Sequence, residues 1–221
     1  NVFILHPNNK ISNIQRKIMT TIGSKNIFNV AVNGSFDDCQ KIVKDMFSDN
    51  QFREQINMSG VNSINWARII CQIVYYFYAV FKFQSKKLNF SVPTGNFGDV
   101  YAGYVAKKMG LSIDKLIVAT NENDILQRVI NTGEYKPSFV KPSLSPSMDI
   151  QVASNFERLL YDVLGQDDHK VKVLMSKLIS EGSFTLSKEE VDNIKKDFSA
   201  VKINDKETLM IIQEFEKKHN F

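Results

Sequence analysis

The sequence predicts an α/β protein: a parallel sheet with flanking helices, joined to a mostly helical C-terminal insertion. Two patterns predict this class. Short β-branched runs alternate with amphipathic segments over residues 1–136, which is typical of strand–helix–strand units. After residue 150, helical periodicity continues without strand runs between the helices. With 43% hydrophobic residues in a length of 221, the chain can bury a sizeable core.

The first strand–helix–strand unit is predicted from local signals. Residues 2–5 are an apolar β-branched run and form the first predicted strand. Ser12 and Gln15 have the spacing of a capping box, so a helix begins there, and Gly23 is expected to end it at the C′ position. Residues 27–32 form the second predicted strand.

Two amphipathic helices are expected next. Ser35 with Asp38 starts the first of them. The second is a long core helix from about Ile64, capped by Asn62 or Ser63. The residues predicted to face inward are Ile42, Val43 and Met46 in the first helix, and Ile69, Ile70, Ile73, Phe77, Val80 and Phe81 in the second.

The third predicted strand, residues 88–92, leads through a glycine loop into a helix that Gly110 ends. A fourth strand at 116–120 is followed by a helix that reaches Gly133. Three prolines interrupt the periodicity after that point. We therefore expect an α/β lobe at 1–136, a linker at 137–150 and a helical insertion at 151–221, with helices at 155–164, 170–179, 187–198 and 205–219.

Composition excludes several classes of function. The formal charge of +4 comes from mixed basic and acidic residues without a basic stripe, which argues against a nucleic-acid partner. The most apolar stretch, 64–83, is interrupted by Arg68 and Lys82, so we expect a buried helix and no membrane span. Cys39 and Cys71 have no metal-site spacing, so no metal is expected. A cytoplasmic location is expected, and the oligomeric state is left open.

The strand–loop–helix at residues 88–110 is where chemistry is expected. Gly95 and Gly98 bracket Asn96 and Phe97 between a parallel strand and a helix N-terminus, where backbone amides can bind an anion. The loop has neither the GxGxxG nor the P-loop pattern, so neither NAD nor ATP is indicated. A plain tight turn is the alternative, with Asp99 as a first-turn acid favoured by the helix dipole.

The amino-acid sequence of this loop resembles that of a known enzyme family. The run Ser-Val-Pro-Thr-Gly-Asn-Phe-Gly-Asp at 91–99, followed by Ala-Gly at 102–103, is similar to the cofactor-phosphate loop of threonine synthases of the enterobacterial and fungal type. Further stretches in the same order resemble the family: Phe-Ile-Leu-His-Pro at 3–7 with Lys-Ile-Ser at 10–12 and Gln15, Asn-Ser-Ile-Asn at 62–65 with Arg68, Ala-Thr-Asn at 119–121 with Asp124, and Ser-Met-Asp at 147–149.

The resemblance implies a fold-type II pyridoxal-phosphate enzyme, similar in fold to the tryptophan synthase β subunit. Such an enzyme converts O-phospho-L-homoserine and water into L-threonine and phosphate. By the same resemblance, the cofactor-binding residues are Gly95, Asn96, Phe97, Gly98 and Asp99, and those that face the substrate phosphate are Asn62, Ser63 and Arg68. On the residues alone, Asn62 or Ser63 can be a simple N-cap and Arg68 a surface side chain.

One departure from the family concerns the catalytic lysine. In the family, the lysine that forms the Schiff base and a Ser-Gly-Asp-Thr-Gly loop both precede the strand with which this chain begins, and neither motif occurs here. We therefore expect no catalytic residue in this chain and no activity of the chain alone. We also expect that the chain is truncated at both ends. A related phospho-lyase of fold type II and a non-catalytic anion-binding module remain as alternatives.

Overall fold

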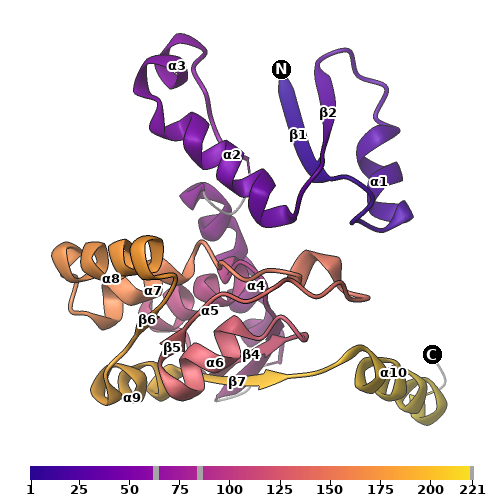
Figure 1. Cartoon of the computed structure of the whole chain (residues 1–221). Helices are drawn as coiled ribbons and strands as arrows, with labels where there is room; N and C mark the ends of the chain where they lie inside the picture. The colour runs from indigo at the N-terminus through magenta and orange to yellow at the C-terminus, as the bar shows by residue number, and fades with distance from the viewer. Residues whose placement is uncertain (62–64, 84–86, 220–221) are drawn as a thin grey trace.

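The computed structural model describes residues 1–61, 65–83 and 87–219. Its first part is a two-stranded parallel sheet with three helices, drawn in indigo and purple at the top of Figure 1. The strands pair in register from Val2 with Ile27 to Pro7 with Val32. The elements are β1 (Val2–Pro7), α1 (Asn13–Thr20), β2 (Ile27–Val32), α2 (Phe36–Ser48) and α3 (Asn50–Gln55).

The capping signals of this first part are confirmed, but the prediction for Gly23 is wrong. Ser12 caps α1, and Ser35 caps α2, each in a complete capping box. Helix α1 already ends at Thr20, and Thr21 closes it with right-handed backbone angles. No left-handed C′ residue is needed, because the N–H of Thr21 still donates to the carbonyl of Lys17.

In two helices the predicted buried face is confirmed only in part: Ile69, Ile73 and Val80 are buried as predicted, and Val43 and Met46 are half-buried. In α2, Cys39 and Gln40 are buried, and Ile42 at the edge of this stripe is 39% exposed. In α4 (Trp66–Phe83), the side chains packed toward α5 are Ile69, Ile73, Tyr76 and Val80. The predicted core residues Ile70 and Phe81 are 50% and 69% exposed, because they lie on the other side of α4. The predicted start at Ile64 and its caps fall outside the described residues.

The second sheet has three parallel strands in the order β3-β4-β7. These are β3 (Leu88–Pro93), β4 (Ile113–Thr120) and β7 (Phe198–Lys202), and the connecting helices include α5 (Gly98–Lys108), α6 (Ile125–Thr132) and α9 (Lys188–Asp197). The predicted ends of two helices are confirmed: Gly110 and Gly133 both adopt positive φ, at 100° and 84°. The α/β class with parallel strands is thus as predicted.

Helices alone were expected after residue 150, and this prediction is wrong. Strand β7 pairs with β4 from Leu116–Phe198 to Thr120–Lys202 and forms an edge of the sheet. Its five residues directly follow α9, so a short strand signal merges with a helical one. The remaining elements are β5 (Glu134–Tyr135), β6 (Phe184–Thr185), the 3-10 turn η1 (Pro146–Met148), α7 (Phe156–Val163), α8 (Asp168–Glu181) and α10 (Asp205–His219).

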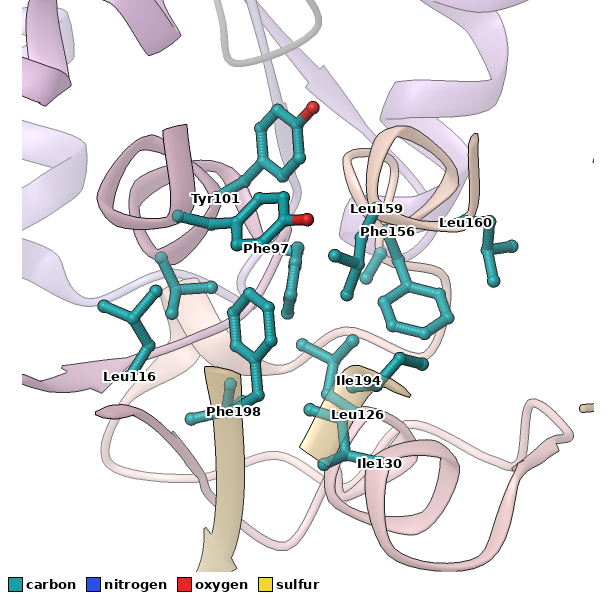
Figure 2. Close-up of a cluster of buried hydrophobic side chains, with 14 of the residues drawn as sticks. Phe97, Tyr101, Leu116, Leu126, Ile130, Phe156, Leu159, Leu160, Ile194 and Phe198 are labelled. Carbon is teal, nitrogen blue, oxygen red and sulfur yellow. The ribbon is translucent and has the colours of Figure 1, made fainter. Parts of the chain in front are cut away.

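The hydrophobic core combines segments that are far apart in sequence. Phe97 from the loop before α5, Phe156 from α7 and Phe198 from β7 are its largest fully buried side chains (Figure 2). Residues before and after 137–150 therefore pack into one cluster. The division into parts at 1–136, 137–150 and 151–221 stays a prediction. Among the described residues, no helix has the length and apolar character that crossing a membrane requires.

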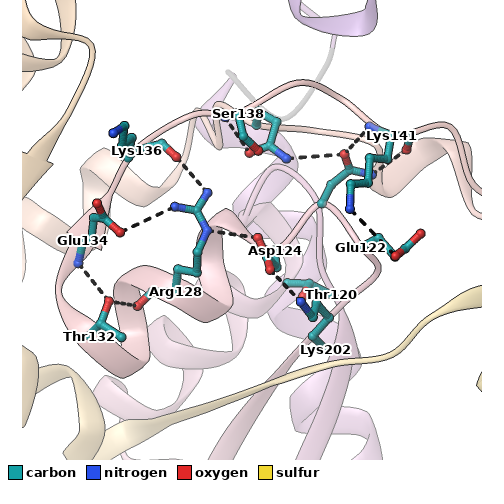
Figure 3. Close-up of polar contacts among 12 residues, drawn as sticks. Thr120, Glu122, Asp124, Arg128, Thr132, Glu134, Lys136, Ser138, Lys141 and Lys202 are labelled. Carbon is teal, nitrogen blue, oxygen red and sulfur yellow. Dashed lines mark hydrogen bonds and ion pairs between the residues drawn. The ribbon is translucent and has the colours of Figure 1, made fainter.

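Ion pairs attach β7 to the start of α6. Asp124 Oδ1 accepts from Arg128 Nε and Asp124 Oδ2 from Lys202 Nζ, both at 2.9 Å (Figure 3). Burial raises the pKa of Asp124, but the hydrogen bonds from Lys202 and Arg128 outweigh it and hold the pKa below its usual value. The ionised carboxylate thus links α6 to the carboxyl end of β7.

Candidate functional site

The candidate site lies at the carboxyl end of β3, where the chain turns into α5. Thr94 anchors the turn, because its N–H donates to the carbonyl of Ala119 on β4 at 2.8 Å. Its hydroxyl donates to the carbonyl of Val92 at 2.6 Å. Parallel strands place such turns together at one edge of the sheet, which is where ligands bind in open α/β sheets.

In the described part of the chain, the turn contains a row of backbone amides without a protein acceptor. The first helical hydrogen bond of the turn runs from Tyr101 N to the carbonyl of Phe97. Within the described part of the chain, the backbone N–H groups of residues 95–100 donate to no protein acceptor. Unpaired N–H groups at the start of an 11-residue helix carry the positive end of its dipole. This arrangement can bind an anion such as a phosphate.

Gly95 is required by the segment that packs against it. A Cβ at this position would lie 2.7 Å from the carbonyl oxygen of Ser147, 3.0 Å from Cδ1 of Ile150 and 3.3 Å from Cα of Met148. Two of these three atoms are backbone and cannot swing aside. The absence of a side chain therefore lets the loop approach η1 and Ile150 closely.

Asn96 is held by two residues that sequence reasoning missed. The N–H and Nδ2 of Asn155 both donate to its carbonyl oxygen at 3.1 Å. Gln40 Nε2 of α2 donates to its Oδ1 at 2.9 Å. Both partners are buried, and the sequence around each of them gives no local signal of this role. Their contact with Asn96 joins positions distant in sequence, which periodicity does not reveal.

Phe97 supports the loop from below. Its backbone is left-handed, with φ 64°, and its side chain is fully buried. The ring packs edge-on against Phe156 and tilted against Phe198, with centroids 5.4 and 5.5 Å apart (Figure 2). The side chain therefore fixes the loop to the core, and in the described part of the chain the main-chain N–H of Phe97 has no protein acceptor.

Asp99 is engaged with α4. Tyr76 Oη donates to the Asp99 carbonyl at 2.9 Å and to Oδ1 at 3.3 Å. Burial raises the pKa of the Asp99 carboxyl above its usual value, and the bond from Tyr76 partly offsets this. A carboxylate accepts hydrogen bonds, so any contact of Asp99 with a phosphate would come from its main-chain N–H.

The predicted substrate-phosphate residues are only partly described. Asn62 and Ser63 lie outside the described residues. Arg68 is exposed near the start of α4, where its Nη1 donates to the carbonyl of Val61 at 3.4 Å. The first turns of α4 and α5 are neighbours, because the centroids of the Trp66 and Tyr101 rings lie 6.2 Å apart. The binding roles of the predicted site residues, Gly98 included, stay predictions.

A polar cluster holds the segment that covers Gly95. Asp149 Oδ1 accepts from Asn121 Nδ2 at 2.7 Å, from Asn123 Nδ2 at 3.1 Å and from Ser143 Oγ at 2.6 Å. Asn121 and Asn123 are buried just after β4. The cluster thus fixes residues 143–149 beside the loop. In the described ranges, no three His, Cys, Asp or Glu side chains form a possible metal site.

An open cavity of about 900 Å³ is lined by residues of α4, α5, α7 and α8 and by none of residues 94–100. Its lining includes Trp66, Tyr101, Asn155 and Arg158. The guanidinium of Arg158 lies 5.2 Å from the centroid of the Trp66 ring, and its Nε donates to Asn155 Oδ1 at 3.0 Å. Since Asn155 also holds the Asn96 carbonyl, the cavity and the loop share a residue.

Comparison with known proteins identifies the family. No family model matches the chain. The threonine synthase of Pseudomonas aeruginosa is 46% identical over 215 residues, which cover 96% of this chain and 46% of that protein. The Saccharomyces cerevisiae threonine synthase is 46% identical, and the matched region covers 94% of this chain and 43% of that protein. Threonine synthases are therefore homologues of this chain over nearly its whole length. The chain spans slightly less than half the length of these relatives.

Solved threonine synthases share the fold. The pyridoxal-phosphate-bound threonine synthase of Brucella melitensis superposes with a TM-score of 0.88 at 47% identity, covering 100% of this chain and 48% of that one. The yeast threonine synthase gives 0.83 at 45% identity, covering 98% of this chain and 45% of that one. The family resemblance inferred from residues 91–99 is thereby confirmed, and the likeness extends through the C-terminal helices.

Proposed function

We propose that this chain is the cofactor-phosphate part of a threonine synthase. The complete enzyme would be a cytoplasmic fold-type II enzyme that uses pyridoxal 5′-phosphate to convert O-phospho-L-homoserine and water into L-threonine and phosphate. The observation that carries the proposal is the row of unpaired amides at residues 95–100. It lies in a chain whose whole length matches a pyridoxal-phosphate-bound threonine synthase.

The loop fits a phosphate monoester. Several backbone N–H groups and a helix dipole suit a dianion. Gly95 allows a close approach of backbone to ligand, and Phe97 anchors the turn in the core, so the amides are ordered before binding. Gly98 begins α5, so no side chain shields the first helical amide. Asp99 would contribute through its main chain only.

The chemistry divides between the cofactor and the chain. Pyridoxal phosphate supplies an electron sink for carbanions when it is bound. The residues of this chain bind and orient. Asn62, Ser63 and Arg68 are proposed to hold the phosphate of the substrate, and the cavity beside Asn155 offers space for the rest of it. No catalytic residue is proposed here, so the chain alone is expected to be inactive.

Ligand titration tests the cofactor site. The chain is titrated with pyridoxal 5′-phosphate, with pyridoxal and with inorganic phosphate. We expect the phosphorylated cofactor and phosphate to compete for one site, and pyridoxal to bind more weakly. Borohydride reduction followed by peptide mapping should give no stoichiometric lysine adduct. Equal affinity for pyridoxal, or one adduct on a single lysine, would contradict the proposal.

A chimera tests the reaction. The chain replaces the matching segment of the Pseudomonas aeruginosa relative, and turnover of O-phospho-L-homoserine is measured for the chimera and for the chain alone. We expect the chimera to release threonine and phosphate in equal amounts, and the isolated chain to release neither. Turnover by the isolated chain would refute the assignment. A chimera that acts only on another phosphorylated amino acid would favour a different phospho-lyase.

A further inference from the structure

Asn96 is held from two directions, and both contacts use its oxygen atoms. Its carbonyl accepts two hydrogen bonds from Asn155, and its Oδ1 accepts one from Gln40 Nε2. In the part of the chain that the structure describes, neither the N–H nor the Nδ2 of Asn96 donates to a protein atom. The acceptors of this residue are satisfied, and its donors are left for a ligand.

Gln40 is an unexpected residue for its place in α2. It is 7% exposed and neighbours the buried Cys39. A buried amide is unfavourable unless it forms hydrogen bonds. Its Nε2 donates a hydrogen bond to Asn96, 56 positions along the chain. An apolar side chain of this length would suit the packing, so the contact with Asn96 accounts for the amide.

This contact determines which end of the Asn96 amide faces a ligand. The amide has an accepting oxygen at one end and a donating NH₂ at the other, and a half-turn exchanges them. A phosphate dianion only accepts hydrogen bonds, so it needs the NH₂ end. We propose that Gln40 is a positioning residue: by holding Oδ1, it presents Nδ2 of Asn96 to the anion in the loop. The inference rests on the proposed function, since that anion is the cofactor phosphate.

In the described residues, the other hydrogen bonds between α1 or α2 and residues after β3 do not reach residues 95–99. Gln15 Nε2 donates to Ser147 Oγ at 3.0 Å, and the N–H of Gln151 donates to Asp37 Oδ2 at 3.4 Å. Gln15 therefore offers a matched control. It has the same side chain and a similar bond across the same boundary, but it does not contact Asn96.

A double-mutant cycle tests the proposal. The dissociation constants of pyridoxal 5′-phosphate and inorganic phosphate are measured by calorimetry for Gln40→Met, Asn96→Ala and the double variant. Gln40→Met should weaken both ligands about tenfold, without further loss when Asn96→Ala is already present. Gln15→Met should leave both constants unchanged. Unaltered affinity in Gln40→Met, or the same loss in the Asn96→Ala background, would overturn the proposal.

A measurement without ligand separates this inference from the proposed function. The side-chain NH₂ signals of Gln40 are identified in a proton–nitrogen NMR spectrum by their loss in Gln40→Met. They should shift in Asn96→Ala, because their acceptor is gone. If the wild-type chain binds neither ligand, the proposed function fails. If the chemical shifts of the Gln40 NH₂ signals are the same in Asn96→Ala as in the wild-type chain, the positioning role is wrong, whatever the affinity for the cofactor.

Discussion

Two properties of Phe97 affect the unfolding free energy of its variants in opposite directions. Its ring is fully buried against Phe156 and Phe198, so truncation to alanine should cost about 3–5 kcal/mol of unfolding free energy. Its backbone is left-handed, which costs a non-glycine residue about 1–2 kcal/mol. Alanine keeps this backbone cost, and glycine removes it.

The expected result is a small difference between Phe97→Ala and Phe97→Gly. Glycine loses about 0.8 kcal/mol with the last buried carbon but gains about 1–2 kcal/mol from the backbone, so the glycine variant should equal the alanine variant or exceed it by up to about 1 kcal/mol. Leu159, buried inside α7, is the control. There, glycine should be about 1.5–2 kcal/mol worse than alanine.

Urea unfolding followed by circular dichroism measures all four variants, with an osmolyte added equally to each so that the weakest stays folded. The gap between the glycine and alanine variants is the quantity that matters, and the chain's total stability cancels from it. A gap at position 97 as large as the gap at position 159 would refute a left-handed Phe97, and with it the described geometry of the loop.

Two further predictions concern the loop and the ion pairs. Gly95→Ala should lower the unfolding free energy by about 1–3 kcal/mol and weaken phosphate binding, because its Cβ would meet the Ser147 carbonyl oxygen; unchanged urea midpoint and affinity would contradict this. Asp124→Asn should cost about 1 kcal/mol at pH 7 through lost contacts with Lys202 and Arg128. Since folding lowers the pKa of Asp124, its contribution is complete above the unfolded pKa near 3.9 and disappears as pH falls through the folded value. Unfolding midpoints from pH 7 to pH 2 measure this, and a difference that persists in acid would contradict it.

Local signals predicted much of the fold. The strand at 27–32, the helix at 205–219, the capping box at Ser12 and the helix start at Ser35 agree with the structure, because each depends on residues within a few positions of one another. Longer-range features were less accessible. Helix α4 is apolar all round, so its periodicity could not tell Ile69 from Ile70, and the difference in burial arises from packing on α5.

The candidate site shows the same division. Gly95 and Gly98 indicate a tight turn at a helix N-terminus. The sequence around them resembles one family closely enough to suggest a cofactor. Gln40 and Asn155 give no comparable signal, because their importance comes from folding together segments 56 and 59 positions away from Asn96. The close approach of Ser147 to Gly95 is likewise a tertiary contact.

The central claim is that the amides at the start of α5 hold the cofactor phosphate. The most direct test is a proton–nitrogen NMR titration of the labelled chain with pyridoxal 5′-phosphate, repeated with inorganic phosphate. The account predicts that both ligands shift the same backbone signals, with the largest changes at Gly95, Asn96, Phe97, Gly98 and Asp99. Binding that leaves these signals unmoved, or that shifts another region instead, would contradict it.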